Sequence, residues 1–332
     1  MHVPDGFLDV PTSVATGVAA VAMVGTALRR AERAITETGP ALPGLTAAFV
    51  FAAQMVNFPV GAGTSGHLLG GALAAALVGP WTATVVITSV LLVQALLFAD
   101  GGLTALGTNV ITMAVVGVVV GYLVARLALR FLPPRARSLV PATALGGLVS
   151  VPAAALAFTG LYAIGGTVDI PIGRLATAMV GWHAVIGVGE ALITAAVLGA
   201  VVATRPDLVH LGRHLQPAGS TVGGPTRVRL GRRGLAIGGA VTLAVASAVS
   251  LAASTHPDGL EYIATSLGFA GAASGSPADR SPLANYVVHG LANPWVSGAA
   301  AGMVGAVVTV VVGLLLTFLA QRRRGRAARA AE

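Results

Sequence analysis

Long apolar stretches, separated by short polar segments, dominate the sequence. Most of them approach or exceed the length of about 20 residues that a helix needs to cross the hydrocarbon core of a bilayer. The simple stretches are 12–28, 42–58, 104–125, 138–164, 174–203, 234–253 and 296–320, and a longer apolar region covers 68–98. This pattern predicts an all-α polytopic membrane protein.

The Arg residues gather behind particular apolar stretches. Eighteen of the 20 lie in the segments 29–33, 126–137, 205–233 and 322–329. By the positive-inside rule these segments are cytoplasmic, where we expect them to contact partner subunits or anionic membrane lipid. The net charge of +8 is therefore a sign of membrane topology, and we expect no nucleic acid as a partner.

The number of membrane crossings decides how the region 68–98 is interpreted. The first apolar stretch and the stretch 104–125 both end in cytoplasmic Arg segments. If 42–58 runs outward and 104–125 runs inward, the region 68–98 must begin and end outside. It crosses twice or re-enters, and the Gly79-Pro80 step supplies a break because Pro disfavours helix in the residue before it. We expect a seven-helix bundle up to residue 203, with the N-terminus outside.

The polar segments between the later stretches predict the domain organisation. The Arg-rich linker 206–233 separates a membrane domain, 1–205, from a C-terminal domain, 234–332. The C-terminal domain is expected to contain two membrane helices joined by an extracellular loop, 254–295, and to end in a basic cytoplasmic tail. The chain is thus expected to be a multi-pass protein of the bacterial plasma membrane.

The composition limits the chemistry that the chain can perform. With 55% apolar and only 10% charged residues it is unlike a soluble domain, and with no Cys it cannot form disulfides or thiolate metal sites. Any metal must therefore be held by nitrogen or oxygen. The first ten residues contain no basic side chain, so we do not interpret them as a secretory signal and expect them to be retained.

The two residues at the start of the chain offer three nitrogens in one place. These are the α-amine of Met1, the backbone amide nitrogen of His2 and an imidazole nitrogen of His2, which together form fused chelate rings. A further imidazole completes a square-planar set that suits Ni(II) or Cu(II), and His67, in a Gly-rich segment, is the candidate. Asp5 and Asp9 would attract a divalent cation, and binding should weaken as the pH falls.

Several other polar residues are candidates for supporting roles. Asp100 lies at the predicted outer end of a helix, and His183 and Glu190 lie two turns apart on one helical face. For this pair a structural hydrogen bond is favoured over a role in metal admission or release, and direct ligation is third. His256 and His289 in the outer loop either are solvated, which is favoured, or collect metal.

Four motifs carry a resemblance to a known family. MHVPDGF, NFPVGAGTSGHLLGG, ADGGLTALGTN and WHAVIGVGEALIT, in this order, resemble the nickel/cobalt-specific substrate-binding (S) component of energy-coupling-factor transporters, the NikM/CbiM family. The resemblance covers residues 1–205. It implies that the N-terminal segment inserts into the bundle and that Met1, His2 and His67 bind the metal. Asn57 and Ser65 share a motif with His67 and are added as supporting residues.

A second resemblance covers the C-terminal part. THPDGLEYIATSLGF is similar to the small two-helix companion subunit of the NikN/CbiN type, whose PDGLE signature, here Pro257 to Glu261, lies between its two membrane helices. The chain therefore resembles a fusion of the two subunits. The implied partners are a transmembrane coupling (T) subunit and two cytoplasmic ATPase subunits.

The leading functional hypothesis is import of Ni(II) or Co(II), as the transported substrate, driven by ATP hydrolysis on separate proteins. The sequence contains no GxxxxGK[ST] motif, so we do not expect this chain to hydrolyse ATP. Which metal is carried stays open, since Cu(II) would bind a planar nitrogen set tighter than Ni(II), and Ni(II) tighter than Co(II). An ion-coupled secondary transporter, with Glu190 and Asp100 relaying protons, is the alternative; a membrane enzyme is disfavoured because HExxH is absent, and we expect no bound catalytic cofactor.

Overall fold

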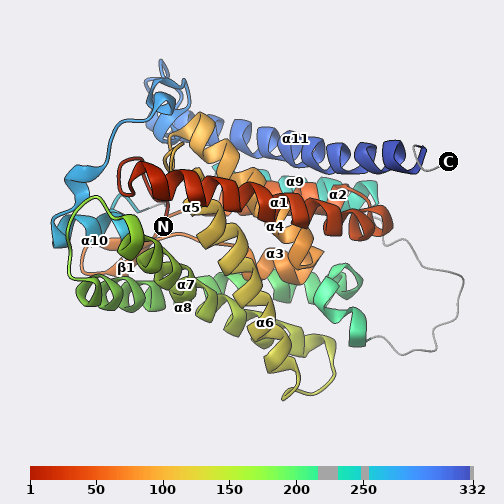
Figure 1. Ribbon diagram of the computed structural model, residues 1–332. Coiled ribbons are helices and arrows are strands. Elements are labelled where there is room, and N and C mark those ends of the chain that lie inside the picture. Colours follow the sequence, from red (N-terminus) through yellow and green to blue (C-terminus); the bar gives the residue numbers. More distant parts are fainter. Residues whose placement is uncertain (216–230, 248–253, 330–332) are drawn as a thin grey trace, which may run out of the picture.

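Helices make up most of the computed structural model, which describes residues 1–215, 231–247 and 254–329 (Figure 1). A two-stranded antiparallel hairpin is the one sheet in that part of the chain. The strands are β1 (Phe58–Gly61) and β2 (Thr64–Gly66). The helices are α1 (Val10–Thr38), α2 (Ala41–Gln54), α3 (Gly71–Val78), α4 (Pro80–Val93), α5 (Leu106–Asn109), α6 (Gly117–Leu129), α7 (Leu139–Gly165), α8 (Ile172–Thr204), α9 (Arg232–Ser247), α10 (Gly259–Leu267) and α11 (Pro294–Arg329).

The two ends of the bundle differ in what they carry. Figure 1 shows the N-terminus, β1 and α10 at one end, and the C-terminus together with the final turns of α1 and α8 at the other. Among the Arg residues that the structure describes, Arg29 and Arg30 lie in the C-terminal part of α1, Arg126 in the last turn of α6, and Arg205 directly after α8. The structure thus separates a basic end from an end where the N-terminus meets the region after residue 254.

Six helical segments in the described part are long and apolar enough to cross a membrane, and five of them precede residue 205. The expected seven crossings in this region stay a prediction, because α2 has only 14 residues and α3 only 8. In the C-terminal domain, α11 qualifies, whereas α9 is described for 16 residues and its expected continuation, 248–253, lies outside the described residues.

The segment between α2 and α3 differs from the expectation. The predicted helix 42–58 ends at Gln54, because the chain turns into the β1–β2 hairpin and Pro59 disfavours helix in the residue before it. After the hairpin the backbone stays non-helical up to Gly70. The expected break in 68–98 is present at Gly79, whose φ of 83° ends α3 before Pro80 starts α4.

Two π-helical segments interrupt the long helices. One, Gln94–Phe98, ends the α4 rod, and the other, Val110–Val116, joins α5 to α6. A π-turn inserts an extra residue and so re-aims the side chains around it, which is why such turns are frequent at functional sites. Here they flank the segment 99–105, which lies against the N-terminal residues.

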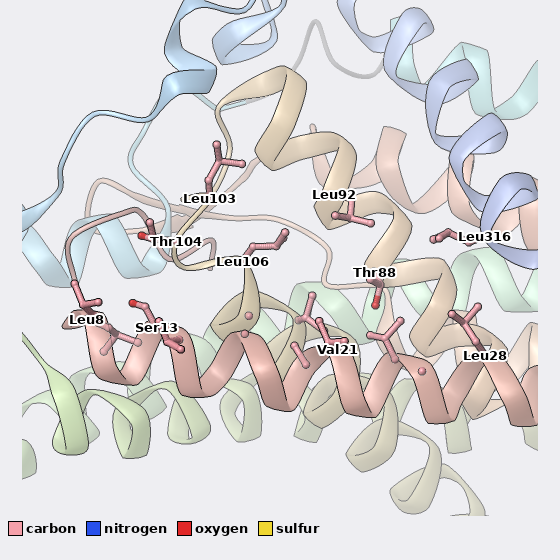
Figure 2. A pocket seen from close by; sticks show the side chains of 18 of the residues that line it. Leu8, Ser13, Val21, Leu28, Thr88, Leu92, Leu103, Thr104, Leu106 and Leu316 are labelled. Carbon is pink, nitrogen blue, oxygen red and sulfur yellow. The ribbon is translucent and has the colours of Figure 1, made fainter. Parts of the chain in front are cut away.

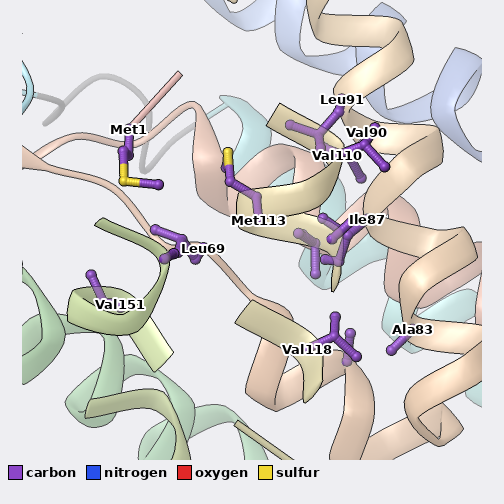
Figure 3. Packing of buried hydrophobic residues seen from close by; sticks show 14 of the residues in the cluster. Met1, Leu69, Ala83, Ile87, Val90, Leu91, Val110, Met113, Val118 and Val151 are labelled. Atoms are coloured by element: carbon purple, nitrogen blue, oxygen red, sulfur yellow. The ribbon is translucent and has the colours of Figure 1, made fainter. Parts of the chain in front are cut away.

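The buried core reaches the very start of the chain. Met1 belongs to the same cluster of buried apolar residues as Leu69 and Met113, and its exposed fraction is only 2% (Figure 3). An N-terminal residue is normally solvated and poorly ordered unless contacts hold it. The burial of Met1 therefore indicates that residues 1–9 form an inserted arm.

A groove of about 1350 Å³ lies between α1 and the elements beside it, with Thr88 and Leu92 of α4 and Leu316 of α11 across from α1 (Figure 2). Its lining is mostly apolar and includes Leu8, Val21 and Leu28 from α1 and its approach, with Leu92 and Leu106 opposite. Met1, His2 and His67 do not line it. Apolar lining along a membrane helix is the expected surface toward lipid, so the candidate metal site lies elsewhere.

Candidate metal centre

The N-terminal arm is held in the bundle through the backbone of Val3 and the carboxylate of Asp5. The Val3 amide donates to Asn109 Oδ1 at 2.8 Å, and Asn109 Nδ2 donates to the Val3 carbonyl at 3.1 Å. Asp5 accepts hydrogen bonds from the amides of Leu103 and Thr104. The side chain of Asn109 thereby pairs both backbone polar groups of a fully buried residue, which satisfies groups that would be costly to bury alone.

This insertion brings Met1, His2 and His67 together. The α-amine nitrogen of Met1 lies 2.5 Å from His67 Nε2. The imidazole rings of His2 and His67 stack with centroids 4.9 Å apart and an interplanar angle of 23°. Three residues that the sequence separates by up to 66 positions therefore lie against one another, and their side chains are almost fully buried.

Main-chain nitrogens are essential to this candidate site. Within the described ranges, no three His, Cys, Asp or Glu side chains are grouped as a metal site. The candidate donors are instead two imidazoles together with the α-amine of Met1 and the amide nitrogen of His2. Such a set can complete a planar arrangement of four nitrogens around a divalent metal.

The ring of His2 is oriented by two polar side chains. Its Nδ1 lies 3.1 Å from Asp100 Oδ1, and its Nε2 lies 3.1 Å from Gln94 Oε1. Tyr286 connects these partners, donating to Asp100 Oδ2 at 2.6 Å and accepting from Gln94 Nε2 at 3.1 Å. If Nδ1 binds metal, Nε2–H can still donate to Gln94, the kind of outer contact that metal-bound imidazoles commonly make.

Burial keeps both imidazoles neutral. It lowers the pKa of His2 and of His67 to about 3, and the positive Met1 amine beside them acts in the same direction. Burial by itself would raise the pKa of Asp258, but the Met1 ammonium and His67 hold the pKa of that carboxyl well below its usual range. The histidines thus keep free lone pairs for a metal over the whole physiological pH range.

Glu190 supports the segment that carries His67. Its Oε2 accepts from the Leu69 amide at 2.6 Å and its Oε1 from the Gly70 amide at 2.9 Å. His67 Nδ1 lies 3.0 Å from the Leu68 carbonyl; donation from Nδ1–H leaves the Nε2 lone pair facing the Met1 amine. The carboxylate therefore contacts the backbone of the segment that carries His67, through both of its oxygens.

Replacing Glu190 with Gln is expected to weaken nickel binding by about tenfold, because one of the two backbone amides loses its acceptor and His67 is less firmly placed. Isothermal titration of the purified protein with Ni(II) measures this. Thr194→Val is the matched control, since this hydroxyl is equally buried one turn further along α8 and has no hydrogen-bond partner in the described part of the chain. Equal affinities for Glu190→Gln and wild type would contradict the prediction.

The remaining predicted residues lie around this centre. Ser65 is fully buried and hydrogen-bonds to the PDGLE segment, and Asn57 accepts from the Ser254 amide through its carbonyl oxygen. His183 Nδ1 lies 2.8 Å from the Met179 carbonyl, within its own helix. Its Nε2 is buried and has no hydrogen-bond partner in the described part of the chain, so the role of His183 stays a prediction.

Four polar residues of the centre were not selected from the sequence. Asn109 ends the ADGGLTALGTN motif, and Asp258 belongs to the PDGLE signature, so both stood in segments already singled out. Gln94 is a rare polar residue in the apolar region 68–98, and this polarity could have marked it as a candidate site residue. Tyr286 carried no signal, because an aromatic residue in a polar loop is unremarkable in sequence.

The fold and the site together define a class of protein: a polytopic membrane protein with a buried set of nitrogen donors near one end of its bundle. Residues 2–208 match the CbiM family, described as the cobalt uptake substrate-specific transmembrane region, and residues 232–322 match the PDGLE domain. The chain belongs to the CbiM family and carries a PDGLE domain behind the CbiM region.

Individual relatives agree with this assignment. A protein of Archaeoglobus fulgidus that carries the name of a fused nickel transport protein, NikMN, is 34% identical over 96% of this chain and 98% of its own. The cobalt transport protein CbiM of Acetohalobium arabaticum is 33% identical over 58% of this chain and 78% of its own. A crystal structure of a truncated transition metal transporter is 33% identical, with a TM-score of 0.55, over 61% of this chain and 99% of that one.

Proposed function

We propose that this chain is the metal-capturing membrane subunit of an energy-coupling-factor importer and that the end bearing the N-terminus faces outward. The observation that carries the proposal is the meeting of the Met1 amine, His2 and His67 in one buried place, at the end of the bundle opposite the final turns of α1 and α8. Neutral imidazoles and an amine suit Ni(II) and Co(II), and relatives named for nickel and cobalt transport support this cargo.

Between the two metals we propose Ni(II) as the preferred substrate. A planar set of four nitrogens binds Ni(II) more tightly than Co(II) in the general order of divalent affinities. The relatives from Archaeoglobus fulgidus and Rhodobacter capsulatus that carry the fused name, NikMN, are both named for nickel. Cu(II) would bind tighter still, so metal supply in the cell also decides what is carried.

We propose that the energy comes from two ATPase subunits acting through a coupling (T) subunit. The chain has no Lys at all, so it has no P-loop lysine with which to hold a nucleotide phosphate. The basic end of the bundle offers positive charge toward cytoplasmic partners or anionic lipid.

An ion-coupled secondary transporter is the alternative, and it needs carboxylates free to relay protons. Both oxygens of Glu190 accept backbone amides, and Asp100 binds Tyr286 and His2. Each carboxylate is therefore held by hydrogen bonds or an ion pair to neighbouring groups and is not free to relay protons. This favours the importer driven by partner subunits.

Uptake of radiolabelled Ni(II) into vesicles that contain this chain, with and without the coupling and ATPase subunits, tests the proposal. We expect ATP and the partners to raise uptake well above that of the chain alone, an uncoupler to have no effect, and His2→Ala to abolish the ATP-dependent part. Uptake by the chain alone that collapses with an uncoupler would establish the alternative.

A further inference from the structure

The PDGLE segment of the C-terminal domain lies directly on the candidate metal centre. The Ser65 amide donates to the Pro257 carbonyl at 2.8 Å, and Ser65 Oγ donates to the His256 carbonyl at 2.8 Å. Ser65 and Asp258 form a parallel bridge, so the segment runs as a neighbour of β2, two residues before His67. A residue more than 190 positions away in sequence is thereby fixed beside the metal-binding arm.

The two carboxylate oxygens of Asp258 make different contacts. Its Oδ1 accepts from the Glu261 amide at 2.9 Å, which makes Asp258 the N-cap of α10. Its Oδ2 points the other way, 2.9 Å from the Met1 amine nitrogen and 3.8 Å from His67 Nε2. The same cap that starts α10 therefore aims a negative oxygen into the centre.

The amine of Met1 lies between His67 Nε2 and this oxygen. Two nitrogens on neighbouring corners of a square-planar site with bonds of about 2 Å are about 2.8 Å apart, close to the 2.5 Å between the amine and His67 Nε2. A primary amine that binds a metal through its lone pair keeps two hydrogens. One of them can still donate to Asp258 Oδ2, so this contact is compatible with both the empty and the loaded centre.

We propose that Asp258 is a positioning residue of the metal centre: its Oδ2 orients the Met1 amine toward the metal, so that the PDGLE segment completes a site whose other donors come from the first 67 residues. This inference rests on the proposed function, in which Met1, His2 and His67 are the ligands. It gives the C-terminal domain a direct part in metal binding, through one hydrogen bond to one ligand.

Asp258→Asn in the full-length protein tests the inference. Asn is as good an N-cap as Asp, so α10 keeps its start while the oxygen on the amine is replaced by an NH₂ group. We expect nickel affinity to fall by about tenfold to a hundredfold, the usual cost of losing an outer contact to a ligand. The visible absorption of the bound Ni(II) should move to longer wavelength, because water, a weaker-field donor, replaces the amine.

Two further variants make the result specific. Asp258→Ser also preserves the cap and should give the same loss. Asp279→Asn removes another capping carboxylate of the same loop, which accepts from the Ser276 amide, and should leave affinity and spectrum unchanged. Wild-type affinity in Asp258→Asn would overturn the proposal, as would a weaker affinity with an unchanged spectrum, since the residue would then act only through the loop.

The failure of this inference can be told apart from the failure of the proposed function. If His2→Ala loses nickel binding while Asp258→Asn keeps it, only the positioning role is wrong. If His2→Ala binds nickel as wild type does, the ligand assignment is wrong and the positioning role fails with it.

Discussion

A Gly/Ser extension of several residues placed before Met1 is expected to abolish high-affinity nickel binding. The Met1 side chain is buried and its nitrogen contacts His67 and Asp258, so an added chain has no room there and moves the α-amine away. Four-ligand zinc sites bind with about 10–16 kcal/mol, which gives each ligand roughly 3 kcal/mol, and the loss of one costs roughly a hundredfold in affinity. Displacing the His2 nitrogens as well makes the loss larger.

Titration with Ni(II) before and after proteolysis directly ahead of Met1 measures this effect, and cleavage should restore binding. The extension must be longer than one residue. A single added residue makes His2 third in the chain, so that an amine, two amides and the imidazole form a planar set without His67. Undiminished binding by the uncleaved protein would show that the α-amine is not a ligand.

Replacing His67 with Ala is the second change with a large expected effect. The Met1 and His2 nitrogens remain, but water must take the fourth position, so we expect nickel affinity to fall by roughly a hundredfold. The matched control is His256→Ala, which removes an exposed imidazole of the neighbouring outer loop. Equal affinities for the two variants, measured by competition with a chelator, would rule out His67 as the fourth donor.

Much of the fold was accessible from the sequence because membrane insertion imposes simple constraints. Apolar length gives the helices that can cross a membrane, because a helix must match the thickness of the hydrocarbon core, whereas the side on which each helix ends stays a prediction from the Arg placement. The break at Gly79 was predicted for the same local reasons that produce it, a helix-ending Gly followed by Pro. The early end of α2 at Gln54 was missed because the apolar pattern continues into the β1 hairpin.

Part of the candidate site could also be predicted from the sequence, and part could not. The sequence itself predicts Met1, His2 and His67 as donors, because the absence of Cys leaves nitrogen or oxygen donors and the start of the chain offers three nitrogens in one place. The contacts through which other residues position these three could not be predicted from the sequence. Gln94 is aimed by a π-turn, and Glu190 reaches the backbone after His67 from a helix more than 120 positions away.

The sequence by itself determined that this is a polytopic membrane protein with Arg-rich segments, several nitrogen atoms at its N-terminus and a PDGLE segment in the C-terminal part. Only the tertiary structure decided that the N-terminal arm is buried and that Asp258 points its second oxygen at the Met1 amine. Local composition and spacing report on neighbours along the chain. The pairing of β2 with the segment before α10 depends on how distant parts of the chain pack, which no local pattern records.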